Sequence, residues 1–114
     1  MIKMEEKKIV FISLPMSGLK PEEALSNIES AKNEYLKRFN LDPENVWFVD
    51  NYYPELNFDT VFGHVDESVY YLGRALQRMA KADEVFFYGN WKNARGCFIE
   101  YTVCEQYGIP YVEV

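Results

Sequence analysis

Glu100 is a carboxylate that stands among small side chains, in the segment NWKNARGCFIEYTVCEQYG at residues 90 to 108. If this segment is helical, spacings of three and four residues place Glu100 on the same side as Gly96, Cys97, Cys104 and Gly108. Small side chains let that side approach a sheet closely, so we expect the carboxylate to be partly desolvated. The early turns of a helix favour the ionised form of an acid, because the positive end of the helix dipole lies there.

A sheltered and charged carboxylate suits nucleophilic attack on the anomeric carbon of a sugar, or electrostatic support of an oxocarbenium-like centre. Glu100 is therefore the candidate catalytic residue. The alternative is a solvent-facing glutamate that pairs with a nearby Lys or Arg, which is the usual place of an acid.

The segment LPMSGL, residues 14 to 19, has the order of a strand, a turn of small residues and a helix. Such a turn can direct backbone N–H groups and the hydroxyls of Ser13 and Ser17 at an anion, with Gly18 in the turn itself. It matches neither the Walker pattern nor GxGxxG, so it does not indicate ATP or dinucleotide binding of those kinds. A plain turn marked by Pro15 and Gly18 is the alternative.

Three further candidates for substrate binding follow the third apolar run of the chain. Trp91 can stack on a nucleobase, although packing in the core is its alternative role. Arg95 can hold a phosphate or a carboxylate, with an exposed helix-surface charge as the alternative. Gly96 lies next to Arg95, at the start of the helix that carries Glu100.

The elements that position these residues alternate along the chain. Short apolar runs predict strands at 7–14, 46–49, 84–89 and 109–114, and helical spacing predicts helices at 21–39, 65–81 and 94–107. Residues 50–64 show no clean period and are expected to form an ordered loop. This alternation is typical of an α/β fold, a short parallel sheet of four to five strands with helices on both faces. The segments after strands one, two and three should meet at the carboxyl edge of the sheet.

Length and composition predict one domain, residues 1–114, because the chain is 48% hydrophobic and too short for two ordinary domains. A net charge of -6 disfavours binding to nucleic acid. The apolar stretch near the N-terminus is too short for a signal peptide or a membrane span, so we expect a cytoplasmic protein without membrane contact. Cys97, Cys104 and the single His64 indicate neither a disulfide framework nor a metal site.

Three segments together resemble the nucleoside 2-deoxyribosyltransferase-like family, including its small bacterial and phage members. They are WKNARGCFIEYTVCEQYGIPYV, the preceding YLGRALQRMAKADEVFF, and KIVFISLPMSG near the start. The resemblance implies a flavodoxin-like three-layer sandwich that cleaves the N-glycosidic bond of a nucleoside or nucleotide without a metal or organic cofactor. It places Glu100 where the family has its nucleophile, and it matches Ser13, Ser17 and Gly18 to the loop that surrounds the sugar or its phosphate.

Two positions depart from the family pattern. Family members often carry an Asp eight residues before the Asp that precedes strand three, and counting back from Asp83 gives Ala75. The first strand commonly offers a Tyr near the nucleophile, where this chain has Phe11. Both departures concern proton delivery to the leaving base. The side chains that offer a replacement are Asp50, Asp59, His64, Asp66 and Glu67.

Three functions follow from these observations. The first is a nucleoside or nucleotide N-glycosidase or deoxyribosyltransferase that uses Glu100. The second is a catalytically silent nucleotide-binding module, in which Ala75 and Phe11 mark the loss of turnover. The third is a purely structural or interaction domain. The high aromatic content predicts a homodimer or a higher homo-oligomer.

Overall fold

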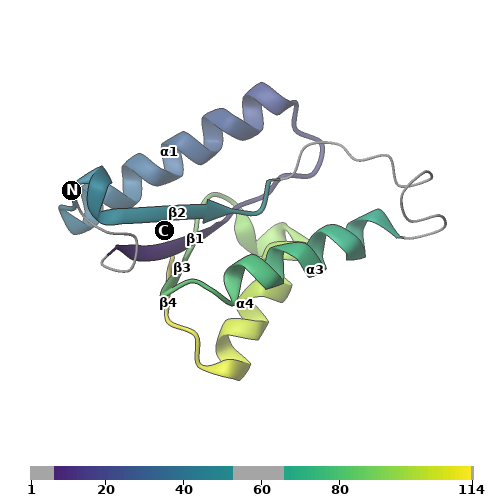
Figure 1. Cartoon of the computed structure of the whole chain (residues 1–114). Coiled ribbons are helices and arrows are strands. Elements are labelled where there is room, and N and C mark those ends of the chain that lie inside the picture. The colour runs from purple at the N-terminus through teal and green to yellow at the C-terminus, as the bar shows by residue number, and fades with distance from the viewer. Residues whose placement is uncertain (1–6, 53–65, 114) are drawn as a thin grey trace.

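A computed structural model describes residues 7–52 and 66–113, which contain a sheet of four parallel strands (Figure 1). The strands lie in the order β2-β1-β3-β4. Their bounds are Lys8–Ser13 for β1, Val46–Asp50 for β2, Glu84–Phe87 for β3 and Tyr111–Glu113 for β4. Both neighbours of β1 pair with it in parallel, which puts the carboxyl ends of all strands at one edge.

Three α-helices cover the two faces of this sheet: α1 (Pro21–Phe39), α3 (Glu67–Met79) and α4 (Arg95–Tyr107). Helix α1 lies on one face, while α3 and α4 lie together on the other (Figure 1). Each face has its own core, built on Ile28 and Tyr35 under α1 and on Met79 and Cys104 under α3 and α4. The predicted three-layer α/β sandwich is confirmed, and its strand order is that of the flavodoxin-like fold.

The helix ends follow from local sequence. Pro21 begins α1, and the side chain of Glu23 accepts a hydrogen bond of 3.0 Å from the backbone N–H of Lys20. Asp66 caps α3, because its Oδ1 accepts from the N–H of Val69 at 3.1 Å. Gly108 ends α4 with a left-handed φ of 68°, as the sequence predicts.

Several elements are shorter than their predicted spans. Strand β3 ends at Phe87, and the next residues turn into a short 3-10 helix, η3 (Trp91–Asn93), that the sequence pattern did not predict. Another 3-10 helix, η2 (Pro43–Asn45), precedes β2. Of the predicted loop at 50–64, Asp50 belongs to β2, and the positions from 53 onward lie outside the described residues.

In the parts of the chain that the structure describes, no helix combines the length and the apolar character needed to cross a membrane. The same parts hold no group of three or more His, Cys, Asp or Glu side chains that could bind a metal ion.

Candidate active site

A cavity of about 700 Å³ lies where the carboxyl ends of β1 and β3 meet the beginnings of α3 and α4. Its walls come from the turn after β1 (residues 14–17), from Asn51 after β2, from α3 and its cap, and from residues 93–97 with Glu100. This is the point at which the chain changes direction across the sheet, going from β1 first to β2 and later to β3. Parallel α/β sheets bind their ligands at such a point.

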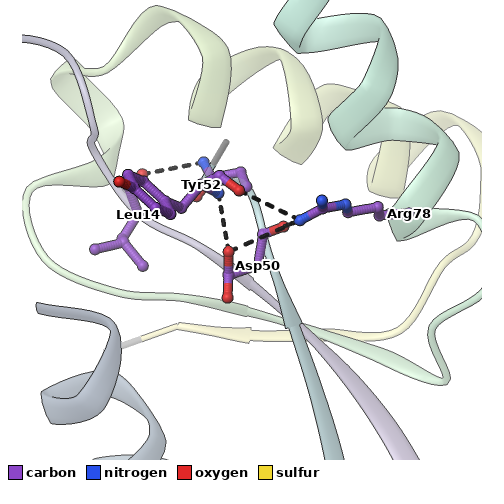
Figure 2. Close-up of polar contacts among 5 residues, drawn as sticks. Leu14, Asp50, Tyr52 and Arg78 are labelled. Atoms are coloured by element: carbon purple, nitrogen blue, oxygen red, sulfur yellow. Dashed lines mark hydrogen bonds and ion pairs between the residues drawn. The ribbon is translucent and has the colours of Figure 1, made fainter. Parts of the chain in front are cut away.

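Polar contacts at the end of β2 hold one wall of this cavity in place (Figure 2). Arg78 of α3 donates to the backbone oxygens of Asp50 and Tyr52, at 2.8 Å and 3.4 Å. The Nδ2 of Asn51 donates to the backbone oxygen of Leu14 at 3.1 Å, which ties the end of β2 to the turn after β1. Neither the place of Asn51 in the cavity wall nor the contacts of Arg78 with the end of β2 was predicted from the sequence. The signal for Asn51 was a polar residue directly after the end of β2.

Glu100 lies in the second turn of α4 and is only 1% exposed, although its side chain lines the cavity. Its Oε1 accepts a hydrogen bond of 2.5 Å from the hydroxyl of Ser13, at the end of β1. The prediction that Glu100 is sheltered is therefore confirmed, and a solvent-facing role is excluded. The carboxyl group joins the helix to the centre of the sheet.

The small residues around Glu100 have different roles. Cys97 and Cys104 are buried on the same side of α4, as expected. Gly96 lines the cavity, and a side chain built there would meet nothing within 4 Å. Gly108 lies at the end of the helix in the left-handed region. The expectation that both glycines allow close approach to the sheet is therefore wrong.

Burial raises the pKa of Glu100 from 4.5 to about 7, and the hydrogen bond from Ser13 opposes this rise. We expected the helix dipole to keep the carboxyl group ionised, but burial raises its pKa instead. Near pH 7 the charged and neutral forms are about equally populated. Burial also raises the pKa of Cys97 to about 12 and of Cys104 to about 11, so both thiols are neutral there.

The turn after β1 contributes differently from each of its candidate residues. Ser17 is exposed and lines the cavity, in the place that the sequence analysis expected for a ligand contact. Gly18 adopts a φ of 79° and shapes the turn without lining the cavity. Ser13 is fully buried beneath Glu100, so its hydroxyl meets the carboxylate and not a bound anion. A smaller cavity of about 250 Å³ is lined by part of this turn together with Asn27 of α1 and residues 88–90.

The two larger candidates for substrate binding differ in their surroundings, because one is buried in the core and the other is exposed at the cavity. Trp91 is 3% exposed, and its ring packs against Phe87 and Tyr101 with centroid distances of 4.8 Å and 5.0 Å. It is a core residue that does not line the cavity, so the prediction of base stacking by Trp91 is wrong. Arg95 lines the cavity as the first residue of α4 and is exposed. Its guanidinium has no hydrogen bond or ion pair with another described residue.

The structure also places the residues that concern proton delivery. Ala75 lines the cavity at 3% exposure, whereas Phe11 lies in the core, away from the cavity. Among the described acids, Asp66 is the one besides Glu100 that lines the cavity. The Asp50 carboxylate instead accepts from the N–H of Tyr52 at 2.9 Å. Two further candidates, Asp59 and His64, lie outside the described residues.

Compared with family models, with curated proteins and with solved structures, the chain has no match. The resemblance to the nucleoside 2-deoxyribosyltransferase-like family therefore stays a prediction from its motifs.

Proposed function

We propose that this protein cleaves the N-glycosidic bond of a nucleoside or nucleotide, or transfers the deoxyribosyl group, with Glu100 as the nucleophile. The observation that carries this proposal is a buried carboxyl group, oriented by the hydroxyl of Ser13, in the wall of a 700 Å³ cavity. Small-molecule sites typically have volumes of about 300–1,000 Å³. A carboxylate in such a place can react with a substrate that has been removed from bulk water.

The reaction has two steps. In the first, a carboxylate oxygen of Glu100 bonds to the anomeric carbon while the bond from that carbon to the base nitrogen breaks. The electron pair of the broken bond leaves with the base, which takes up a proton. In the second step, water or another base attacks the anomeric carbon of the glycosyl ester, releases the Glu100 carboxylate, and gives up a proton.

Asp66 is the proton donor that we assign to the first step. It lines the same cavity as Glu100, from the beginning of α3. Its Oδ1 accepts from the N–H of Val69, which fixes the carboxyl group at the rim. In the family pattern this proton comes from an acid at the position of Ala75, which lines the cavity nine residues further along the chain, in the same helix α3. Asp66 would replace that acid from the neighbouring part of the same wall.

A phosphate on the substrate has a natural partner in Arg95. This side chain lies at the first residue of α4, and Ser17 lines the same cavity from the turn after β1. A guanidinium binds phosphate oxygens in pairs, and the N-terminal end of a helix favours negative charge. Arg95 therefore supports a nucleotide as well as a nucleoside as the substrate.

A catalytically silent nucleotide-binding module is the second candidate. Two observations favour it: Ala75 stands where the family has an acid, and burial leaves about half of Glu100 neutral at pH 7. A neutral carboxyl group binds by donating a hydrogen bond, which requires no turnover.

The test is a chromatographic assay for free base, run on a panel of ribo- and deoxyribonucleosides and their 5′-monophosphates. Glu100→Gln keeps the size of the side chain and removes the nucleophile, so we expect turnover to fall by about a thousandfold or more. Glu105→Gln is the matched control, because Glu105 lies on the same helix and is exposed. Mass spectrometry of the wild-type protein with a slow substrate should find the sugar attached to Glu100.

Undiminished turnover in Glu100→Gln would remove the enzyme proposal. If no substrate in the panel releases base, but a nucleoside or nucleotide raises the melting temperature, then the binding module is the correct function.

A further inference from the structure

We infer that Ser13 is a positioning residue for Glu100: its buried hydroxyl holds Oε1, so that Oε2 is the oxygen presented to the cavity. The kinetic part of this inference rests on the proposed function. The structural part, which concerns the orientation and ionisation of one carboxyl group, can be measured without any turnover.

The donor of this hydrogen bond lies on β1, an inner strand of the sheet. Ser13 ends β1, a strand with neighbours on both sides, and it pairs with Phe87 of β3. Its own backbone oxygen accepts from the N–H of Tyr88 at 3.0 Å. The hydroxyl thus has a fixed origin, and it reaches the flexible side chain of Glu100 at 2.5 Å. The contact selects one arrangement of a side chain that otherwise rotates about three bonds.

The two oxygens of Glu100 are made unequal by this contact. Ser13 is 0% exposed and does not line the cavity, so Oε1 is directed toward the sheet. Glu100 lines the cavity, and Oε2 is not one of the fully enclosed side-chain atoms that lack a hydrogen-bond partner, so we assign Oε2 to the cavity side. No described residue donates a hydrogen bond to Oε2. An oxygen that is free of hydrogen bonds is the better nucleophile, because no donor must be displaced before it attacks.

No other described neighbour takes over the role of Ser13. The thiols of Cys97 and Cys104 stay neutral because burial raises their pKa, so they place neither a positive nor a negative charge beside the carboxylate. The remaining titratable or charged groups that line the cavity are Arg95 on α4 and, at α3, Asp66 and Tyr71. The Ser13 hydroxyl is the hydrogen-bond donor that lowers the pKa of Glu100 against the effect of burial.

The first experiment measures the carboxyl group directly. The protein is labelled with glutamate that carries ¹³C at the carboxyl carbon, and the Glu100 resonance is assigned by its absence in Glu100→Gln. In Ser13→Ala we expect the pKa of Glu100 to rise from about 7 to about 8 or above, since a charged acceptor loses its donor. Ser13→Cys keeps a weaker donor of similar size and should give an intermediate pKa.

Thr102→Ala is the matched control, because it removes a hydroxyl from the same helix. Within the described part of the chain, that hydroxyl donates to the backbone oxygen of Phe98. The variant should leave the pKa of Glu100 unchanged. A residue with a merely structural role would lower the melting temperature in Ser13→Ala without moving this pKa. An unchanged or lowered pKa of Glu100 in Ser13→Ala therefore overturns the inference.

The second experiment uses turnover. In Ser13→Ala the acidic limb of the pH–rate profile should move upward with the pKa of Glu100. A loss of kcat should persist above the new pKa, because the orientation is lost as well. If Glu100→Gln abolishes turnover but Ser13→Ala changes neither the profile nor kcat, the inference fails and the proposed function stands. If the wild-type protein shows no turnover, the proposed function fails, and the NMR titration still decides the role of Ser13.

Discussion

Replacement of Glu100 by Gln should make the protein more stable while it removes the proposed nucleophile. The reason is the raised pKa of Glu100, which burial moves from 4.5 to about 7. Between these two pH values the unfolded chain releases the proton of this carboxyl group while the folded protein still holds it. Unfolding then becomes easier as the pH rises, because the stability falls wherever the folded state binds more protons.

The size of the effect follows from the pKa difference of about 2.5. Each pKa unit corresponds to about 1.4 kcal/mol, so the ionised Glu100 lowers the free energy of unfolding by roughly 3 kcal/mol above pH 7. Below pH 4.5 the carboxyl group is neutral in both states and has no such effect. Gln is neutral at every pH, and its amide oxygen can still accept the hydrogen bond from Ser13.

The assay is urea unfolding of the wild type and the variant at several pH values from 4.5 to 8. The free energy of unfolding of Glu100→Gln should match the wild type at the acidic end and exceed it by about 3 kcal/mol at the alkaline end. Glu34→Gln is the control, because Glu34 is exposed on α1 and should show a small and constant difference. A Glu100→Gln variant that is no more stable than the wild type at pH 8 would refute the reasoning from burial.

Three further predictions concern activity. Turnover should rise with pH as Glu100 ionises, and at pH 6 it should be about a tenth of its plateau value, measured as initial rates of base release. Asp66→Asn keeps a good helix cap but removes the acid, so kcat for a natural nucleoside should fall by about a hundredfold; a substrate whose leaving group needs no proton should be unaffected. Arg95→Gln should raise KM about tenfold for a nucleotide and leave KM for the nucleoside unchanged. The control is Arg74→Gln, on the exposed part of α3, which should leave both KM values unchanged.

The sequence predicted the fold well because the apolar residues that mark its strands and helices are the ones that folding buries. Each of the four strands is a short apolar run, and Val10, Phe11 and Ile12 are fully buried, as expected for a strand covered on both faces. The order of strands and helices then allows few arrangements, because parallel crossovers have one hand. The carboxyl ends of the strands consequently meet, and the segments that follow β1 and β3 both line the cavity.

Individual site residues were harder to predict, because their roles depend on the direction of each side chain. Ser13 lies two residues after Phe11, so the alternation of a strand puts both on the face that α3 and α4 cover. This alternation could have been predicted from the sequence. It directs the Ser13 hydroxyl toward α4 and not toward a bound anion. The place of Trp91 was not readable, because the short helix η3 turns its ring back onto Phe87.

The sequence also could not predict whether burial or the helix dipole has the larger effect on the pKa of Glu100. Spacing shows which side of α4 carries the carboxyl group, but not how deep that side lies. At 1% exposure, desolvation raises the pKa of Glu100 by more than the hydrogen bond from Ser13 lowers it.

The intermediate pKa of Glu100 makes pH the variable that separates the two candidate functions. A nucleophile acts as the ionised carboxylate, so turnover increases as the pH rises through about 7. A binding module that uses the neutral carboxyl group as a hydrogen-bond donor loses that donor over the same range, so its affinity decreases as the pH rises. Calorimetry of a nucleotide with the wild type and with Glu100→Gln, whose amide remains a donor at every pH, tests this directly. If the affinity for the nucleotide declines above pH 7 in the wild type but stays constant in Glu100→Gln, the protein is a binding module that needs the proton on Glu100. If the rate of base release instead increases over the same pH range, the protein is an enzyme in which Glu100 must lose that proton before it reacts.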